Sequence, residues 1–458
     1  MRTTKLALAV MAGAILAACG GGDSGKPQSG AQVNKVQFAS QVSFGDSLSD
    51  LGTYNVGTVK AMGGGKYTIN GDSTAINATF TGKNWTELMA AQFGLPAPCP
   101  AQTGLDGDAS KGFSVPVVDH AQCFSYAQGG ARVTDPIGAG HKLTGSALGA
   151  LTVPVVTQVK NHLAKTGGKF KGDEVVFVMA GGNDVLVNLA QLSAGATAAG
   201  NTAGQQAFAT SLATQLAAGA TNPATAAPAI GLAIATESAR SGSTQTSIVQ
   251  AAVTAAVMAG NTTAPANVTA IVDTATKGAT AAGTKAGADY VTAQAPAMVA
   301  ALTTAGAELA ALVKSQIVGN GANYVVVNNL PDVASTPAGR SRDANVRALI
   351  DKMVQAFNAQ LTSALSSESK VVIVDVYAVS HDQATNPGPY GLTNVSEPAC
   401  DLGAAKNPLG SSLGCTAANL KSGDVSHYSY ADEVHPTPFN NLLLARYVSR
   451  SLVTKGWL

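Results

Sequence analysis

A histidine and a carboxylate lie three residues apart near the C-terminus, in the segment DEVHPT at residues 432–437. At this spacing the Asp432 carboxylate can fold back to accept the Nδ1 proton of His435, which leaves Nε2 free to take a proton from a nucleophile. Carboxylates near the other histidines lie on the wrong side or in polar loops, so we expect surface or structural roles for His120, His141, His162, His381 and His427. The pattern predicts that His435 is a general base oriented by Asp432.

Three Gly-Asp-Ser triplets could supply the nucleophile, and they end at Ser24, Ser47 and Ser73. Only the triplet at residues 45–47 directly follows an apolar run typical of a buried strand, residues 36–44. We expect a helix to begin at residues 48–51, which would expose the serine and favour negative charge beside it through the helix dipole. Ser47 could instead only cap that helix. Together with a histidine base, the position predicts that Ser47 is the nucleophile.

A hydroxyl that attacks an ester also needs hydrogen-bond donors for the oxyanion. Asn183 lies in GGND, directly after an apolar run at residues 174–180, and Gly129 lies in YAQGGA, after a weaker strand-like run. Both follow the C-terminal end of an expected strand, as Ser47 does, and open α/β sheets bind ligands at that edge. Each residue could alone be a turn residue. In combination they predict an oxyanion hole.

The elements that must position these residues alternate along the chain. Short runs rich in Val, Ile and Phe are typical of strands buried on both faces, and helix-like stretches separate them. This alternation predicts a doubly wound α/β fold with a parallel sheet. The expected strands are residues 36–44, 174–180, 323–329 and 371–376, and the expected helices are residues 85–93, 153–165, 307–317, 347–366 and 439–453.

Residues 191–302 differ from the rest, because Ala, Thr and Gly make up most of this segment and charges are scarce. We interpret it as a helical insertion with breaks near Gly200, residues 222–228 and residues 260–265. It is rooted at the C-terminal edge of the sheet. It could therefore be a cap over the pocket, or an Ala-rich hairpin that is packed on itself or partly disordered.

The N-terminus has the layout of a bacterial export signal, with Arg2 and Lys5 before an apolar run that is too short to span a bilayer. We expect a signal peptide at residues 1–18. The sequence LAAC ending at Cys19 resembles the lipobox of bacterial lipoproteins, which implies lipidation of Cys19 and, without a following Asp, sorting to the outer membrane. Ordinary cleavage would instead release a periplasmic or secreted protein. Residues 19–35 are rich in Gly and Ser and are expected to form a flexible tether.

Four cysteines remain after Cys19, an even number that indicates two disulfides in an exported protein. Three pairings are possible, and we favour the local ones, Cys99–Cys123 and Cys400–Cys415. No CxxC or HExxH spacing supports a zinc site, so we expect neither a metal nor another cofactor. The net charge of +1 gives no electrostatic case for a nucleic-acid partner.

These motifs together resemble the GDSL, or SGNH, hydrolase family. The blocks are FGDSLSD at residues 44–50, YAQGGA at 126–131, GGND at 181–184 and DEVHPT at 432–437. The resemblance covers most of residues 36–458 but not the insertion at 191–302. It implies a three-layer, flavodoxin-like fold and ester hydrolysis through an acyl-enzyme without a metal.

The same resemblance assigns roles to single residues. Ser47 takes the place of the nucleophile, His435 of the base and Asp432 of the orienting acid. The Ser47 amide, the Asn183 side chain and the amide of Gly129 match the oxyanion hole, although Gly130 could supply that last amide instead.

A second serine pattern is GSSLG at residues 410–414, which fits the GxSxG elbow of other hydrolases. That elbow needs a strand before it and a helix after it, so we expect a loop here. The sequence therefore predicts an esterase or lipase acting on lipid-like or short acyl esters. Carbohydrate acetylesterase and polyester depolymerase are alternative activities, and an inactive surface-binding lipoprotein is the alternative of another class.

Overall fold

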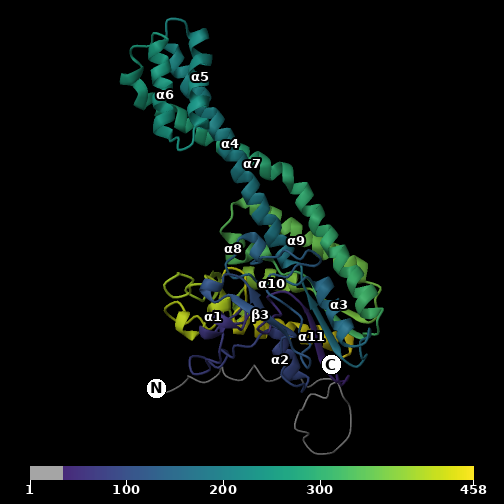
Figure 1. Cartoon of the computed structure of the whole chain (residues 1–458). Coiled ribbons are helices and arrows are strands. Elements are labelled where there is room, and N and C mark those ends of the chain that lie inside the picture. The colour runs from purple at the N-terminus through teal and green to yellow at the C-terminus, as the bar shows by residue number, and fades with distance from the viewer. Residues whose placement is uncertain (1–34) are drawn as a thin grey trace, which may run out of the picture.

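The computed structural model describes residues 35–458 (Figure 1). Four parallel strands form the central sheet in the order β1-β4-β5-β6. Residues 124–128 continue this sheet beyond β1, because Tyr126 N–H donates to the Ser43 carbonyl (2.7 Å) and Gln128 N–H to the Gly45 carbonyl (3.1 Å). The spatial order of the five segments is then 2-1-3-4-5, the flavodoxin-like order. The predicted α/β fold and its four strands are confirmed.

The two faces of the sheet are covered by different helices, which makes the three layers that the family resemblance implies. Alternate side chains of a strand point to opposite faces. Phe177 of β4 lies in a core with α2 and α11, whereas its neighbours Val176 and Val178 lie in the larger core with α3, α7 and α9. Because both faces of each strand are buried, side chains on both faces are apolar, and the strands show no alternation of apolar and polar residues.

The four predicted strands and the predicted helices at residues 85–93, 153–165, 347–366 and 439–453 match observed elements to within about five residues, whereas the predicted helix at 307–317 is the end of the much longer α7 and the π-helical turn after it. The strands are β1 (Gln41–Gly45), β2 (Gln102–Asp106), β3 (Ser114–Asp119), β4 (Val175–Met179), β5 (Tyr324–Asn328), β6 (Val371–Val374), β7 (Asn394–Pro398) and β8 (Tyr428–Tyr430). The helices are α1 (Gly57–Ala61), α2 (Trp85–Gln92), α3 (Val155–Lys165), α4 (Gly182–Ala218), α5 (Pro223–Ala239), α6 (Gln245–Met258), α7 (Ala264–Leu312), α8 (Pro337–Arg340), α9 (Ala344–Leu365), α10 (Val376–Thr385) and α11 (Pro438–Lys455).

Two disulfides crosslink segments of the chain that lie outside the central sheet. Cys99–Cys123 closes the segment that carries the β2–β3 hairpin, and Cys400–Cys415 closes a loop between β7 and β8. Both predicted pairings are confirmed. The predicted signal peptide, lipidation site at Cys19 and most of the tether lie outside the described residues.

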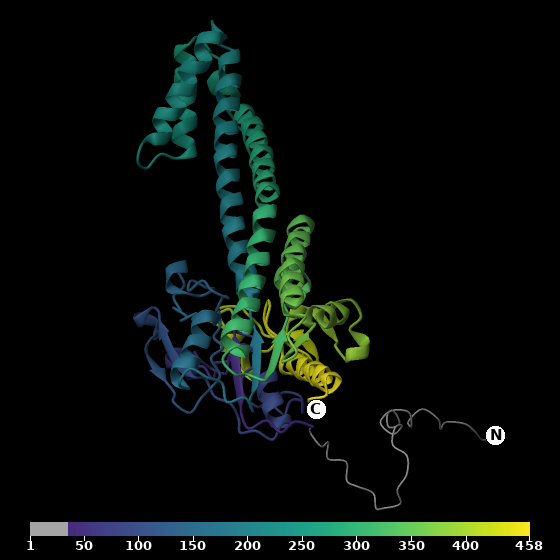
Figure 2. The same cartoon turned by 90° about the vertical axis from the view of Figure 1, so that its right-hand side faces the viewer.

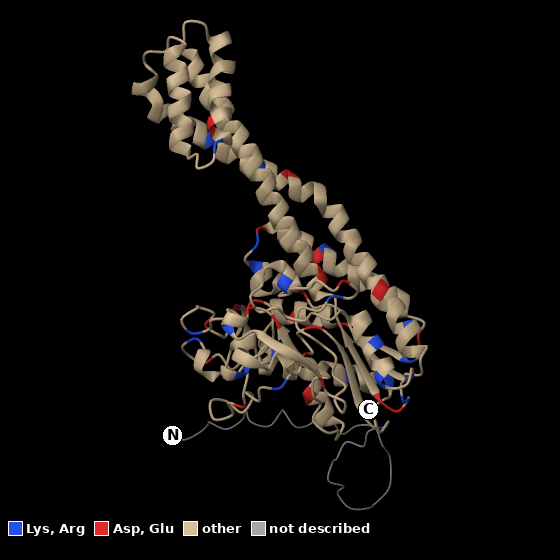
Figure 3. Ribbon diagram, viewed as in Figure 1, with Lys and Arg blue, Asp and Glu red and all other residues tan. Residues whose placement is uncertain are grey.

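The insertion forms a long helical hairpin that rises from the C-terminal edge of the sheet (Figures 1 and 2). Its two long helices, α4 and α7, run side by side and form what we call the stalk. α5 and α6 pack at the far end of the stalk, around a separate apolar core that includes Leu212, Leu216, Ile230 and Ile234. Charged residues are sparse along the stalk and at its far end (Figure 3). The insertion therefore packs on itself, and its far end points away from the sheet.

The predicted break at Gly200 is wrong, because α4 continues through this residue to Ala218. A Cβ at Gly200 would lie 2.9 Å from the Gly283 carbonyl oxygen of α7. The glycine therefore lets the two helices approach closely, and this packing offsets its low helix propensity, about 1 kcal/mol relative to Ala. The predicted break at residues 260–265 corresponds to the turn between α6 and α7, whereas the one at residues 222–228 is misplaced, because the turn between α4 and α5 lies before Pro223 and residues 223–228 are helical.

The continuous helix from α7 into the π-helical turn Val313–Val318 is long and apolar enough to cross a membrane by length and composition. Of its most apolar window, 39% is buried inside the protein. Leu302 and Leu309 are buried in the core beside the sheet, and Ala264 and Ala275 are buried in the core at the far end of the stalk.

Candidate active site

The structure brings Ser47, His435 and Asp432 together in a hydrogen-bonded row. Ser47 Oγ lies 2.8 Å from His435 Nε2, and His435 Nδ1 lies 2.8 Å from each carboxylate oxygen of Asp432. Ser47 is half-buried, while the side chains of His435 and Asp432 are 12% and 5% exposed. With the proton on Nδ1, the imidazole can accept the Ser47 hydroxyl proton at Nε2.

Gly45 fixes the end of β1, two residues before Ser47. A Cβ at this position would lie 2.2 Å from the Met179 carbonyl oxygen, so only glycine fits between β1 and β4. Gln158 of α3 donates to the Gly45 carbonyl (2.8 Å) and accepts from the Gly45 N–H (2.9 Å). The end of the strand, and with it the nucleophile, is therefore held from two sides.

The predicted helix at residues 48–51 is wrong, because the chain turns there instead. The side chain of Asp46 accepts from Leu48 N–H (3.1 Å), and that of Asp50 accepts from Gly52 and Thr53 N–H (2.9 and 2.8 Å). Aspartate side chains that bind nearby backbone N–H groups compete with the helix for these donors. No helix dipole therefore acts on Ser47 from this segment.

Asp432 is held by four backbone or hydroxyl donors besides His435 Nδ1. Its Oδ1 accepts from the N–H groups of Val434 and His435 (3.0 and 2.8 Å), and its Oδ2 from Ser412 N–H (2.7 Å) and Ser411 Oγ (3.4 Å). Burial by itself raises the pKa of Asp432, but the nearby His435 and these hydrogen bonds outweigh it and lower that pKa below its ordinary value. Asp432 is therefore held ionised.

The serine of the GSSLG pattern contributes a backbone amide to the site. Ser412 is fully buried, and its Oγ has no hydrogen-bond partner within residues 35–458. It lies in a 3₁₀ turn, as a loop residue, and not in a strand–helix elbow. The sequence pattern gave no sign that its N–H binds Asp432, because the two residues meet only in the folded chain.

The donors that the sequence predicted for an oxyanion differ in whether they are free to bind another acceptor. Gly129 N–H donates to Asp50 Oδ2 (2.8 Å), so of the two glycines that the sequence left open, Gly129 has its amide engaged. The Gly130 and Ser47 amides have no acceptor within residues 35–458. Asn183 Nδ2 donates to the Ala131 carbonyl (3.0 Å), and a primary amide has a second N–H for another acceptor. The available donors are therefore Ser47, Gly130 and Asn183.

Asp184 joins the start of α4 to the loop that carries these glycines. Its carboxylate accepts from Arg132 Nε (2.9 Å) and Val133 N–H (3.1 Å). Burial raises the pKa of Asp184, and Arg132 opposes this. The GGND motif thus positions the neighbouring loop as well as supplying Asn183.

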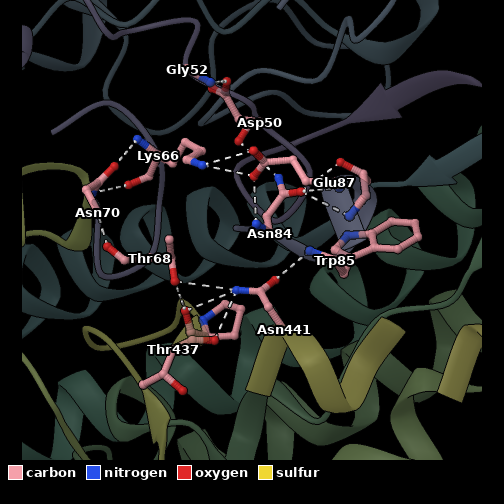
Figure 4. A network of polar contacts seen from close by, with 12 residues as sticks. Asp50, Gly52, Lys66, Thr68, Asn70, Asn84, Trp85, Glu87, Thr437 and Asn441 are labelled. Carbon is pink, nitrogen blue, oxygen red and sulfur yellow. Dashed lines mark hydrogen bonds and ion pairs between the residues drawn. The ribbon is translucent and has the colours of Figure 1, made fainter. Parts of the chain in front are cut away.

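A network of polar contacts links the loop after Ser47 to the segment after His435 (Figure 4). Asn84 Nδ2 donates to the Asp50 carbonyl (3.2 Å), and Thr68 Oγ1 donates to the Pro436 carbonyl (2.9 Å). Asn441 Nδ2 lies 3.5 Å from both Thr68 Oγ1 and the Pro436 carbonyl. These contacts help to fix the position of Ser47 relative to His435, although the two residues are 388 positions apart in the sequence.

The other five histidines lie outside this row of residues. His381 nevertheless has a carboxylate partner, since its Nδ1 lies 2.8 Å from Asp332 Oδ2, but no serine hydrogen-bonds to it within residues 35–458. His162 is fully buried among aromatic rings, and this burial lowers its pKa to about 4. Sequence spacing could not reveal either environment, because the surrounding residues come from distant segments.

Asp46 is a buried acid beside the site, and we expect it to make stability depend on pH. Burial raises the pKa of Asp46 to about 7, against the lowering effects of the Leu48 amide and His435. The folded state then binds a proton that the unfolded state has lost, so stability falls as pH rises from about 4 to 7. Asp46→Asn should remove this loss. The free energy of unfolding of the variant, relative to that of the parent protein, should therefore be about 2 to 4 kcal/mol more favourable to the folded state at pH 8 than at pH 5.

Urea unfolding of both proteins at pH 5 and pH 8 measures this difference. Asp72→Asn is the matched control, because Asp72 holds the same place in another Gly-Asp-Ser triplet but is exposed. An Asp46→Asn variant with the same pH dependence as the parent protein would contradict the assignment.

Comparisons with known proteins support a relation to the GDSL family. No family model matches the chain. It is similar to a GDSL esterase/lipase, APG, of Arabidopsis thaliana (27% identity over 141 residues, 28% of this chain and 39% of that protein). It is also similar to the anther-specific proline-rich protein APG of Brassica napus (26% over 163 residues, 33% and 35%) and to a second Arabidopsis GDSL esterase/lipase (30% over 133 residues, 27% and 35%). The alignments span less than two fifths of each relative. These distant and partial similarities support a hydrolase of the GDSL family.

Proposed function

We propose that the chain is a serine ester hydrolase that works through an acyl-enzyme on Ser47. Ser47 Oγ attacks the ester carbonyl carbon while its proton passes to His435 Nε2. The tetrahedral intermediate expels the alcohol, which takes that proton from His435. A water molecule then attacks the acyl group, gives a proton to the same nitrogen, and the acid leaves as Ser47 recovers its proton.

The single observation that carries this proposal is the hydrogen-bonded row from Ser47 Oγ through His435 to Asp432, with 2.8 Å at each step. The amides of Ser47 and Gly130 and the side chain of Asn183 would receive the oxyanion. A negative charge that develops beside such preorganised donors is stabilised more in the transition state than in the ester.

An apolar cavity of about 60 Å³ supports short acyl chains as the substrate class. It is lined by Leu48, which follows Ser47, and by Val434 and Pro436, which flank His435. Its other apolar lining residues include Met179, Val376, Val379 and Leu444. About 10–15 Å³ of such space holds one water-sized group. The cavity therefore has room for an acyl chain of about four carbons.

The test is hydrolysis of p-nitrophenyl esters that differ only in acyl length. We expect kcat/KM to be highest between acetate and butyrate and several-fold lower for dodecanoate and longer esters. A maximum at long chains would contradict the short-chain assignment. The absence of turnover with every ester would favour the alternative of another class, a surface-binding protein that keeps the fold.

Asn183→Ala should lower kcat by about 10²- to 10³-fold with a smaller change in KM, because the lost donor acts mainly on the transition state. Steady-state kinetics with p-nitrophenyl butyrate measures both constants. Asn183 also binds the Ala131 carbonyl, so thermal unfolding of the variant must accompany the kinetics. A change confined to KM would mean that Asn183 binds the ester equally in both states.

We further propose that the enzyme is exported and anchored to the outer membrane through lipidated Cys19. The LAAC sequence and the Gly/Ser-rich residues that follow it support this location. Fractionation of cells that express the full chain tests the proposal. Recovery of the mature protein only in the soluble periplasm or the medium would contradict the anchor.

A further inference from the structure

Tyr67 packs directly against the proposed base, although no motif marks it in the sequence. The centroids of the Tyr67 and His435 rings are 4.7 Å apart, and the rings are tilted by 38°. A cation within about 6 Å of an aromatic face is attracted by the ring quadrupole. The imidazole of His435 becomes such a cation each time it takes a proton from Ser47.

The far edge of the same ring lies against the glycine loop. A Cβ on Gly129 would lie 2.3 Å from Tyr67 Oη, so the ring occupies the space that a side chain there would need. Tyr54 stands edge-on to this ring and donates its hydroxyl to the Gly129 carbonyl (2.7 Å). Tyr67 thus lies between the base and the loop that carries the Gly130 amide.

The two residues that flank Tyr67 in the chain, Lys66 and Thr68, are held by hydrogen bonds (Figure 4). Lys66 N–H donates to Asn70 Oδ1 (2.8 Å), and Asn70 Nδ2 donates to the Ser412 carbonyl (3.0 Å), next to the amide that binds Asp432. On the other side, the Thr68 hydroxyl binds the residue after His435. The position of the ring is therefore set by the same contacts that set the triad.

The Tyr67 hydroxyl forms no hydrogen bond within residues 35–458. Burial raises the pKa of Tyr67 well above its ordinary value, and Tyr54, Asp50 and Asp432 add to this effect. The side chain therefore stays neutral over the working pH range. It presents to the base an uncharged ring with its electron-rich face.

We propose that Tyr67 is a positioning residue that stabilises the protonated form of His435 through its ring face. This inference rests on the proposed function. The groups that act on His435 are the Asp432 carboxylate, the buried Asp46 carboxyl, the Ser47 hydroxyl and the Tyr67 ring. Among these only the ring is an uncharged aromatic surface, so its contribution can be changed without altering a carboxylate or a proton-transfer partner.

Tyr67→Leu and Tyr67→Phe separate the ring from the hydroxyl. Tyr67→Leu should lower kcat about 3- to 30-fold, since a cation–π contact contributes about 0.5 to 2 kcal/mol, and should leave KM within about twofold. Loss of the ring favours neutral imidazole, so the acid limb of the kcat/KM profile should move to lower pH by about half a unit or more. Tyr67→Phe should keep both constants within about threefold of the parent enzyme. A Phe variant as impaired as the Leu variant would overturn the proposal and assign the effect to the hydroxyl.

A second series keeps the shape of the side chain, in case Tyr67→Leu fails to fold. Phenylalanine with one, two or three fluorine atoms at position 67 weakens the ring quadrupole stepwise. The acid limb should move to lower pH with each fluorine, and an unchanged acid limb across the series would overturn the proposal. The matched control is Tyr377→Leu, because Tyr377 stacks on His381 outside the triad (5.8 Å between centroids) and should leave the profile unchanged.

An NMR titration of the His435 imidazole separates this inference from the proposed function. The measurement is made in a Ser47→Ala background, which needs no activity. The titration midpoint should fall when Tyr67→Leu is added. An unchanged midpoint overturns the role of Tyr67, whatever the protein hydrolyses. A lowered midpoint in a protein that hydrolyses no ester would uphold the contact and reject only the proposed function.

Discussion

Ser47→Ala is expected to lower kcat for ester hydrolysis by about 10⁶-fold, to the level left by the oxyanion donors and binding alone. In the proposed mechanism the hydroxyl forms the covalent bond, and no other serine hydroxyl hydrogen-bonds to His435 within residues 35–458. Ser47 is half-buried at a turn, so loss of one oxygen should cost little stability. Steady-state kinetics with p-nitrophenyl butyrate and thermal unfolding check the two parts of this prediction.

Ser73→Ala is the matched control for this experiment. Ser73 ends another Gly-Asp-Ser triplet, is half-buried like Ser47 and lies outside the hydrogen-bonded row. It should retain full activity. A Ser47→Ala enzyme that keeps more than about one per cent of the parent kcat would contradict the role of Ser47.

Asp432→Asn is expected to lower kcat by about 10⁴-fold with little change in KM. The carboxylate binds the protonated Nδ1 of His435 with both oxygens, which leaves Nε2 as the acceptor for the Ser47 proton. Ser412 N–H donates to Oδ2 and Val434 N–H donates to Oδ1, so both oxygens of Asp432 are acceptors. The NH₂ group of an asparagine would replace one of these oxygens, and it would then face a backbone N–H or the N–H of the imidazole instead of accepting from it. Either arrangement disturbs the tautomer that accepts the proton.

The kinetic constants of Asp432→Asn should be measured together with its stability, because Asp432 is buried. Glu433→Gln is the control, since this neighbouring carboxylate is exposed and should be dispensable. A decrease in kcat of less than tenfold in a folded Asp432→Asn protein would show that His435 needs no orienting acid.

The sheet and the row of catalytic candidates could be predicted because their signals are local. Each strand is a short apolar run, and Asp432 and His435 are close in sequence. Ser47 stands out because its triplet follows such a run, whereas the triplets that end at Ser24 and Ser73 do not. The location of Asn183 follows from the same rule, since parallel strands end at one edge of the sheet.

Apart from the helix expected at residues 48–51, which the nearby side chains of Asp46 and Asp50 prevent, the features that were wrong or missed depend on contacts between distant residues. Gly129 could not be separated from Gly130 until the Asp50 carboxylate was seen to bind the Gly129 amide. Gly200 has the propensity of a helix breaker, but the backbone of α7 packs against it. Tyr67 lies in a glycine-rich stretch without periodicity, so nothing in its neighbourhood indicates a contact with His435.

Labelling with a fluorophosphonate, followed by peptide mass spectrometry, tests the central claim most directly. An activated serine oxygen attacks the phosphorus and expels fluoride, which leaves a stable adduct that resembles the acyl-enzyme. We predict one adduct per folded chain, located on Ser47, with loss of esterase activity in proportion to labelling. The adduct should be absent in a His435→Ala variant and in the denatured protein. An adduct on any other serine, such as Ser412, or full esterase activity without an adduct would contradict an acyl-enzyme on Ser47.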